Sequence, residues 1–250
     1  MKKPIFTKFN SDRIFYCKVT LAVYATWGIA FVAIGAITTQ LPKIDLALFI
    51  DSQIPLSSRF VWFYMLTYFI PITLVVCCKD WHLYNRTILS FISASCIAFF
   101  SYLMIPVEVP RYFPSGEFSA RILEANYKLD FMTRANNFPS LHVAATWIFF
   151  LCINGQFKSR LLSLVLIILT LMISFSTVLV KQHLIVDALA GFVLAFFSWS
   201  LVKRMYAKAS AEESNPTEKL KIILQKNIRN FCWIVVATLI VFYFRWSIFQ

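Results

Sequence analysis

Long uncharged apolar stretches alternate with short polar segments along most of this 250-residue chain. Six stretches are clear: residues 19–39, 60–78, 87–107, 141–153, 161–180 and 188–202. A helix needs about 20 mostly apolar residues to cross a bilayer, so the pattern predicts membrane-spanning helices. The fourth and sixth stretches are short, and we expect these two helices to continue into polar residues at the membrane edge. The fold class predicted by the pattern is all-α, a polytopic membrane helix bundle.

A seventh apolar stretch lies near the C-terminus, over residues 231–249. It contains Arg245, whose long side chain can extend from a helix end to the membrane interface. A polar, basic segment separates this stretch from the sixth one. We therefore expect a six-span membrane domain over residues 1–202, a cytoplasmic linker over 203–230 and a seventh spanning helix over 231–250.

The composition also indicates a membrane protein. Apolar residues make up 59% of the chain and charged residues 14%, against roughly 45–50% and about 25% in soluble domains. A soluble fold of this size would have too few polar residues to cover its surface. The composition excludes a soluble enzyme, a disordered chain, a disulfide-rich secreted scaffold and a nucleic-acid binder, although the net charge is +12.

The basic residues predict the orientation of the bundle. With the N-terminus inside, 16 lysines and arginines fall in inner segments and 7 in outer segments. Cytoplasmic loops carry this excess in membrane proteins, so we expect a cytoplasmic N-terminus. Short loops and lysine-rich inner segments favour a bacterial inner membrane with a periplasmic outer face. None of the six cysteines falls in an outer loop, so we expect no disulfide.

The longest outer loop covers residues 108–139 and begins with a proline-rich stretch that presents Arg111. It continues with apolar residues at helical spacing, which predict an amphipathic helix over about residues 118–134. The apolar positions are Phe118, Ile122, Ala125, Leu129 and Met132. Two interpretations are open: a helix that lies on the membrane surface or on the bundle, and a lid over a lipid entrance.

Two histidines are candidates for catalysis. His142 lies at the start of the fourth span, two residues after Ser140. Serine is a good helix N-cap, and the free N–H groups at the start of that helix would attract an anion. His183 and Asp187 are four residues apart, so on a helix they would share a face. A carboxylate that accepts from one imidazole nitrogen leaves the other free as a nucleophile. A salt-bridged pair at a helix end is the simpler alternative.

The predicted topology brings these residues together. His142 and His183 are 41 residues apart, which is the length of two spans of about 20 residues each. One span crosses the membrane inward and the next crosses it outward, so both histidines lie at the outer face. Arg111 and Lys181 lie on that face too. Cations hold phosphate oxygens while one histidine attacks and the other protonates the leaving oxygen. The sequence predicts a phosphate-handling site with no metal and no other cofactor, because it shows no carboxylate cluster.

These residues resemble the type 2 phosphatidic acid phosphatase (PAP2) superfamily over roughly residues 20–202. The family's third motif, Ser-Arg-x5-His-x3-Asp, is matched in spacing by Ser176, His183 and Asp187. Its second motif, Pro-Ser-Gly-His, is matched by Pro139, Ser140 and His142. Its first motif, Lys-x6-Arg-Pro, is matched only by Arg111.

The chain departs from these motifs at four positions. Leu141 replaces the glycine of the second motif and Thr177 the arginine of the third, while Met104 and Tyr112 replace the lysine and proline of the first. These variants look more like the branch that contains inositol phosphorylceramide synthases and related bacterial membrane enzymes. That branch includes phosphotransferases. Two cations of the usual phosphate site are missing, and the candidates to replace them are Lys181 and Arg134.

The resemblance implies a lipid phosphatase that acts on a phosphorylated lipid within the bilayer. By position, His183 would form a phosphohistidine, Asp187 would orient it, and His142 would protonate the leaving group and then activate water or an alcohol. Arg111, Ser140 and Lys181 would hold the phosphate. The same chemistry would serve a lipid phosphotransferase. Two alternatives are more remote. A transporter would carry ionisable residues near the middle of the membrane, whereas the six spans carry theirs at the ends. A catalytically inactive relative would not need both histidines, which are present.

Overall fold

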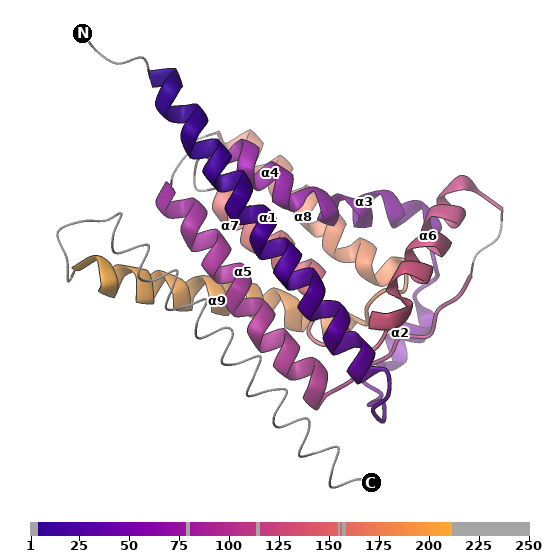
Figure 1. The fold of residues 1–250 in the computed structure, drawn as a ribbon. Helices are drawn as coiled ribbons and strands as arrows, with labels where there is room; N and C mark the ends of the chain where they lie inside the picture. The colour runs from indigo at the N-terminus through magenta and orange to yellow at the C-terminus, as the bar shows by residue number, and fades with distance from the viewer. Residues whose placement is uncertain (1–4, 79–80, 114–115, 155, 157–158, 212–250) are drawn as a thin grey trace, which may run out of the picture.

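The computed structural model describes residues 5–78, 81–113, 116–154, 156 and 159–211. The described chain is a bundle of α-helices with short 3₁₀ turns (Figure 1). The expected seventh helix over residues 231–250 lies outside the described residues. The elements are α1 (Ile5–Thr38), α2 (Phe49–Gln53), η1 (Ser58–Phe60), α3 (Val61–Met65), η2 (Leu66–Phe69), α4 (Ile70–Cys77), α5 (Trp81–Met104), α6 (Phe118–Leu129), η3 (Asp130–Thr133), α7 (Leu141–Asn154), α8 (Arg160–Leu179) and α9 (Ile185–Ala211).

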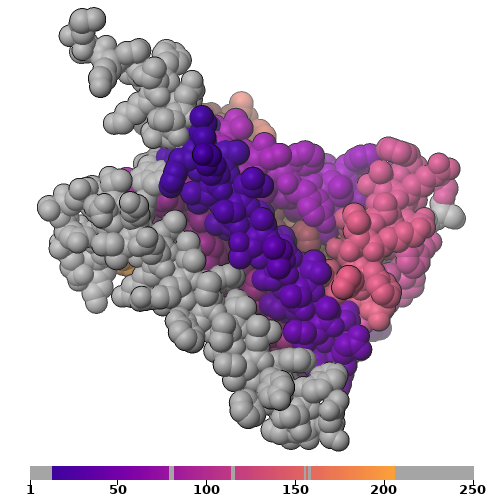
Figure 2. All heavy atoms as spheres, viewed as in Figure 1, coloured from indigo at the N-terminus to yellow at the C-terminus, as the bar shows by residue number. Residues whose placement is uncertain are grey.

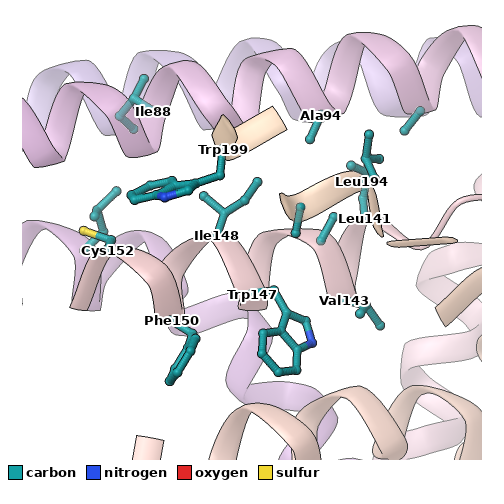
Figure 3. Close-up of a cluster of buried hydrophobic side chains, with 14 of the residues drawn as sticks. Ile88, Ala94, Leu141, Val143, Trp147, Ile148, Phe150, Cys152, Leu194 and Trp199 are labelled. Atoms are coloured by element: carbon teal, nitrogen blue, oxygen red, sulfur yellow. The ribbon is translucent and has the colours of Figure 1, made fainter. Parts of the chain in front are cut away.

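The centre of the bundle is α7, which packs against α4, α5, α8 and α9. Apolar side chains fill the space between these helices (Figure 3). Ile148 of α7, Ala94 of α5 and Leu194 of α9 are almost completely buried. The core residues of each helix are spaced mainly three, four or seven positions apart. This spacing is typical of a helix that packs through one face. The core therefore fixes the starts of α7 and α9 relative to each other.

Helix length confirms a membrane bundle. Five described helical segments are long and apolar enough to cross a bilayer. The remaining predicted span is α7, which has 14 residues and is mostly buried, shorter than the roughly 20 residues that a bilayer requires. The five segments are Arg13–Thr38, Ser58–Cys77, His82–Met104, Arg160–Leu179 and Ile185–Met205.

Helix α9 extends past the predicted end of the sixth span. It continues to Ala211, so the first residues of the predicted linker over 203–230 are helical. Lysine, arginine, methionine and alanine, which are frequent there, are all good helix formers. The change from apolar to charged residues therefore marks the end of the apolar span and not the end of the helix. The rest of the linker lies outside the described residues.

The amphipathic helix of the long loop is present as α6, followed by η3. The face that packs on the bundle is mainly not the apolar stripe. Leu123, Asn126 and Tyr127 are buried against the bundle, whereas Phe118 and Leu129 are 67% and 82% exposed. The α6 helix lies against α3 and η1 (right in Figure 1). Most of its apolar stripe thus remains on the surface, with Ile122 half-buried against the bundle, while its mixed face packs on the bundle.

Candidate active site

The two histidines meet at one end of the bundle, which we call the histidine end. His142 is on the first turn of α7, and His183 lies in the turn between α8 and α9. A hydrogen bond of 3.2 Å joins Nδ1 of His142 to Nε2 of His183. The side chain of His183 is only 4% exposed. The packing of α7 against α8 and α9 brings together two residues that are 41 positions apart.

A carboxylate lies behind His183. Nδ1 of His183 is 3.6 Å from Oδ2 of the fully buried Asp187. Because α9 begins at Ile185, the two side chains meet across the start of the helix and not along one helical face. Oδ2 of Asp187 also accepts from the backbone N–H of Leu184 at 2.9 Å. This second contact holds the carboxylate in place beside the imidazole.

The start of α7 lies directly against α9. Oγ of Ser140 accepts from the backbone N–H of Val143 at 3.3 Å, as the predicted N-cap would. The backbone N–H of Ser140 donates to the carbonyl of Asp187 at 3.0 Å. A Cβ at Gly191 would lie 2.3 Å from the Ser140 carbonyl oxygen. Only glycine lets the two backbones approach this closely, so Gly191 brings the two histidines within reach of each other.

Arg111 is connected to the turn that carries His183. Its guanidinium donates to Oε1 of Gln182, the residue before His183. The guanidinium also lies over the ring of Tyr127, 4.9 Å from the centroid. Gln182 is 2% exposed, so the arginine is held from both sides at the edge of the site.

The two candidate replacement cations differ in position. Lys181 donates from Nζ to the backbone carbonyl of Asp51 at 2.9 Å and lines a cavity with His183. It has a backbone φ of 51°, which is unusual for a lysine. Arg134 instead pairs with Glu108 at 3.3 Å. Of the two, only Lys181 is described in the same cavity as a histidine.

Several residues of the site were not foreseen. The hydroxyl of Tyr64 lies 3.0 Å from Nε2 of His142, and Oδ1 of Asp51 accepts from the backbone N–H of Ile185 at 2.9 Å, at the start of α9. Tyr64 stands in the middle of an apolar stretch, where a tyrosine is ordinarily a packing residue. Asp51 lies on the short helix α2, between two predicted spans and outside every motif. No periodicity or motif could have singled out either residue.

Two cavities border His183. The first is about 100 Å³ in volume, and both histidines line it. Figure 2 shows the surface hollowed between α1 and the α3–α4 segment, the elements that form its walls. The second cavity is about 480 Å³ and is lined by Lys181, Asp51 and Tyr112. The first cavity is mainly aromatic, with the rings of Tyr24, Trp27, Phe31, Tyr68, Phe91 and Tyr102.

One further carboxyl group lies near the arginine. Burial raises the pKa of Asp130, while the positive charge of Arg111 and a hydrogen bond with Gln182 act in the opposite direction. By contrast, the exposed Glu117 has a lowered pKa because it is hydrogen-bonded to Arg59. Asp130 is thus a titratable group close to the residues expected to hold phosphate. Within the described part of the chain, no three His, Cys, Asp or Glu side chains are grouped as a metal site would require.

A comparison with known families gives a match that covers this site. The family described as the PAP2 superfamily matches residues 44–201, which is more than half of the chain. The matched region contains Arg111, His142, His183 and Asp187. A comparison with curated proteins finds no match.

Proposed function

The chain belongs to the PAP2 superfamily, and we propose that it is an integral membrane lipid phosphatase. It would hydrolyse a lipid phosphate or pyrophosphate through a phosphohistidine, without a metal. The observation that carries the proposal is the buried pair of His142 and His183, 3.2 Å apart and with Asp187 behind His183. This is the arrangement of a nucleophile, an acid and an orienting carboxylate.

The first half-reaction transfers the phosphoryl group to the protein. Nε2 of His183 attacks phosphorus while the bond to the lipid or phosphate oxygen breaks. The leaving oxygen takes the Nδ1 proton of His142, which enters this step as the imidazolium and leaves it as neutral imidazole. Asp187 accepts from Nδ1–H of His183 and stabilises the positive charge that develops on the ring. The two imidazoles must separate for this step, because the phosphoryl group has to lie between them.

The second half-reaction releases phosphate. His142, now without its Nδ1 proton, takes a proton from a water molecule that attacks phosphorus. The bond between phosphorus and Nε2 of His183 breaks, and free imidazole is restored. Arg111, Lys181, Ser140 and the N–H groups at the start of α7 would hold the phosphate oxygens through both steps. Arg134, paired with Glu108, is the weaker candidate for this role.

The aromatic cavity supports a lipid substrate. It opens between α1 and the α3–α4 segment and reaches both histidines (Figure 2). A hydrocarbon chain in contact with these rings would place its phosphate beside His142 and His183. The excess of basic residues in the segments predicted to be inside supports a site on the outer, periplasmic face.

A second candidate function is transfer of the phosphoryl-bearing group to an alcohol. The observation that favours it is the cavity of about 480 Å³ that borders His183 and contains Lys181. Its volume leaves room for an acceptor alcohol beside the phosphohistidine. The covalent intermediate is the same in both reactions, and they differ only in whether water or the alcohol attacks.

A phosphate-release assay in EDTA tests the proposal. The substrates are phosphatidic acid, phosphatidylglycerol phosphate, undecaprenyl pyrophosphate, a lipid A phosphate and a sphingolipid phosphate, each with and without candidate alcohols. We expect wild-type protein to release phosphate from at least one lipid, and His183→Ala to release none. His82→Ala, which changes a histidine at the start of α5, is the matched control. Equal rates for wild type and His183→Ala would contradict the proposal, and label in a new lipid instead of free phosphate would identify a transferase.

A further inference from the structure

We infer that Tyr64 is a positioning residue for His142: its hydroxyl fixes which imidazole nitrogen takes part in proton transfer. The inference rests on the proposed function for its catalytic consequence, but its structural core is independent. Tyr64 is on α3, is completely buried, and lies 78 residues away from His142 in the chain. Its hydroxyl lies 3.0 Å from Nε2 of His142.

With His183 as the nucleophile, one arrangement of protons satisfies the hydrogen bonds of the resting site. If His183 is to attack through Nε2, its proton must be on Nδ1, facing Asp187. Nε2 of His183 then carries a lone pair, so Nδ1 of His142, 3.2 Å away, must donate to it. A neutral His142 that donates from Nδ1 has a lone pair on Nε2. The hydroxyl of Tyr64 donates to that lone pair, so the donors run from Tyr64 through His142 to His183, whose Nδ1 lies 3.6 Å from Oδ2 of Asp187.

The opposite tautomer of His142 would place two lone pairs face to face. Nδ1 of His142 and Nε2 of His183 would then both be acceptors at 3.2 Å, which is unfavourable in a buried site. Tyr64 therefore stabilises the tautomer whose proton points to the place where the phosphoryl group enters. A phenylalanine at position 64 would leave Nε2 of His142 without this donor and weaken the preference, of which only the contact with His183 would remain.

To act as the acid, His142 must first take a second proton at Nε2 from solvent, because a neutral ring that lost its Nδ1 proton would become an imidazolate. The tyrosine hydroxyl also serves this charged ring. In the imidazolium, Nε2–H donates to the Tyr64 oxygen, and the Tyr64 O–H turns towards the hydroxyl of Tyr68, 3.5 Å away. Tyr64 keeps its own proton throughout. Only Nδ1 of His142 then exchanges a proton with the leaving oxygen and with water. The same hydroxyl thus reserves Nδ1 for both halves of the reaction.

Further hydrogen bonds extend from Tyr68 to the edge of the site. Nδ2 of Asn126, on α6, donates to the hydroxyl of Tyr68 at 3.1 Å. Oδ1 of Asn126 accepts from Nε2 of Gln182 at 2.6 Å, and Oε1 of Gln182 accepts from Arg111. These contacts hold the Tyr64–Tyr68 pair in place. They also give α6 a role that its apolar stripe did not suggest. Through Asn126, its packed face helps to hold Tyr68 and Tyr64 beside His142, the proposed acid.

A leaving-group comparison tests the catalytic consequence. Tyr64→Phe keeps the ring and removes only the hydroxyl. An alkyl lipid phosphate needs protonation of its leaving oxygen, whereas a nitrophenyl phosphate does not. We expect kcat on the alkyl ester to fall by about 10- to 100-fold, kcat on the aryl ester by less than about threefold, and KM to change little. Tyr84→Phe removes another buried hydroxyl, one that bonds to Thr20 and the Tyr16 carbonyl, and should leave both rates unchanged.

Equal losses of kcat on the two esters would show a merely structural role and overturn the inference. Unchanged activity of Tyr64→Phe on the alkyl ester would overturn it as well. Either result leaves the proposed function intact, because that function is tested by wild-type activity and by His183→Ala.

A second measurement needs no activity. The chain has three histidines, so ¹⁵N-histidine NMR of the full protein in nanodiscs can resolve His142, assigned by loss of its signals in His142→Gln. We expect protonated Nδ1 and unprotonated Nε2 in the wild type near neutral pH. In Tyr64→Phe we expect a mixture of tautomers, and in Tyr84→Phe the wild-type pattern. An unchanged His142 tautomer in Tyr64→Phe would overturn the inference even if the chain proved inactive on every lipid phosphate.

Discussion

The two halves of the candidate site are built in different ways. The α7–α9 half holds His142, His183 and Asp187 through backbone contacts, such as the 3.0 Å hydrogen bond from Ser140 N–H to the Asp187 carbonyl. The α3–α6 half reaches the same site through hydroxyl and amide groups, with Tyr64 and Asn126 as its main members. In the proposed mechanism, the first half carries the reacting atoms, and the second determines how one of them is protonated.

Substitutions in the two halves should therefore have different kinds of effect on the reaction. Changes in the α7–α9 half should abolish the reaction or separate the histidines. Changes at the edge of the α3–α6 half should alter rates, substrate affinity or pH dependence by smaller factors.

Asp187→Asn should cause the largest loss among variants that keep both histidines. An amide can still accept from the Leu184 N–H, but it cannot stabilise a charged His183 ring. We expect kcat to fall by about 10³- to 10⁴-fold in the phosphate-release assay. The matched control is Asp51→Asn, a second buried carboxyl group at the start of α9. A loss at Asp51 as large as that at Asp187 would show that both carboxylates only cap the helix.

Gly191→Ala should damage the α7–α9 half through its backbone. The added Cβ would meet the Ser140 carbonyl oxygen at 2.3 Å, so α7 and α9 must move apart. We expect a loss of about 1–3 kcal/mol in unfolding free energy and a lower kcat, because His142 moves away from His183. The control is Gly28→Ala in α1, where a Cβ would meet nothing within 4 Å. Equal thermal stability of the two variants would contradict this packing account.

Lys181 and Arg134 should differ in their effect on substrate affinity. Lys181→Asn removes the charge and suits the positive φ of this position. We expect KM for a lipid phosphate to rise about tenfold, because one charge-assisted hydrogen bond to phosphate is lost. Arg134→Gln, which removes a cation paired with Glu108, should change KM by less than about twofold. The reverse order of KM values would assign the missing cation to Arg134.

Asp130→Asn should change the pH dependence, with the smallest effect. Burial raises the pKa of Asp130, so the folded protein binds this proton more tightly than the unfolded chain. Its stability should therefore fall as the pH rises from the ordinary carboxyl pKa through the raised one. Ionised Asp130 also opposes phosphate near Arg111, so wild-type KM should rise roughly two- to threefold over the same range. A KM profile of Asp130→Asn that follows the wild type would exclude this role.

The α7–α9 half could be predicted from the sequence because span lengths and short residue spacings determine which of its residues meet. Spans of similar length return His142 and His183 to one face, and a spacing of four residues brings Asp187 to His183. The α3–α6 half depends on contacts between segments 58 or 78 residues apart. Tyr64 lies within an apolar span, and Asn126 lies on a mixed face of α6. Neither residue differs in pattern from an ordinary packing residue, so only the tertiary structure reveals its partner.

The central claim is that His183 carries the phosphoryl group, and trapping the intermediate tests it most directly. Wild-type protein is mixed with a ³²P-labelled lipid phosphate that it cleaves, quenched in alkali within one turnover, and analysed by peptide mapping. We predict alkali-stable, acid-labile label on His183, more label in His142→Ala given an aryl ester, and none in His183→Ala. Label on another residue, or phosphate release by wild type with no labelled protein at any time, would contradict the account.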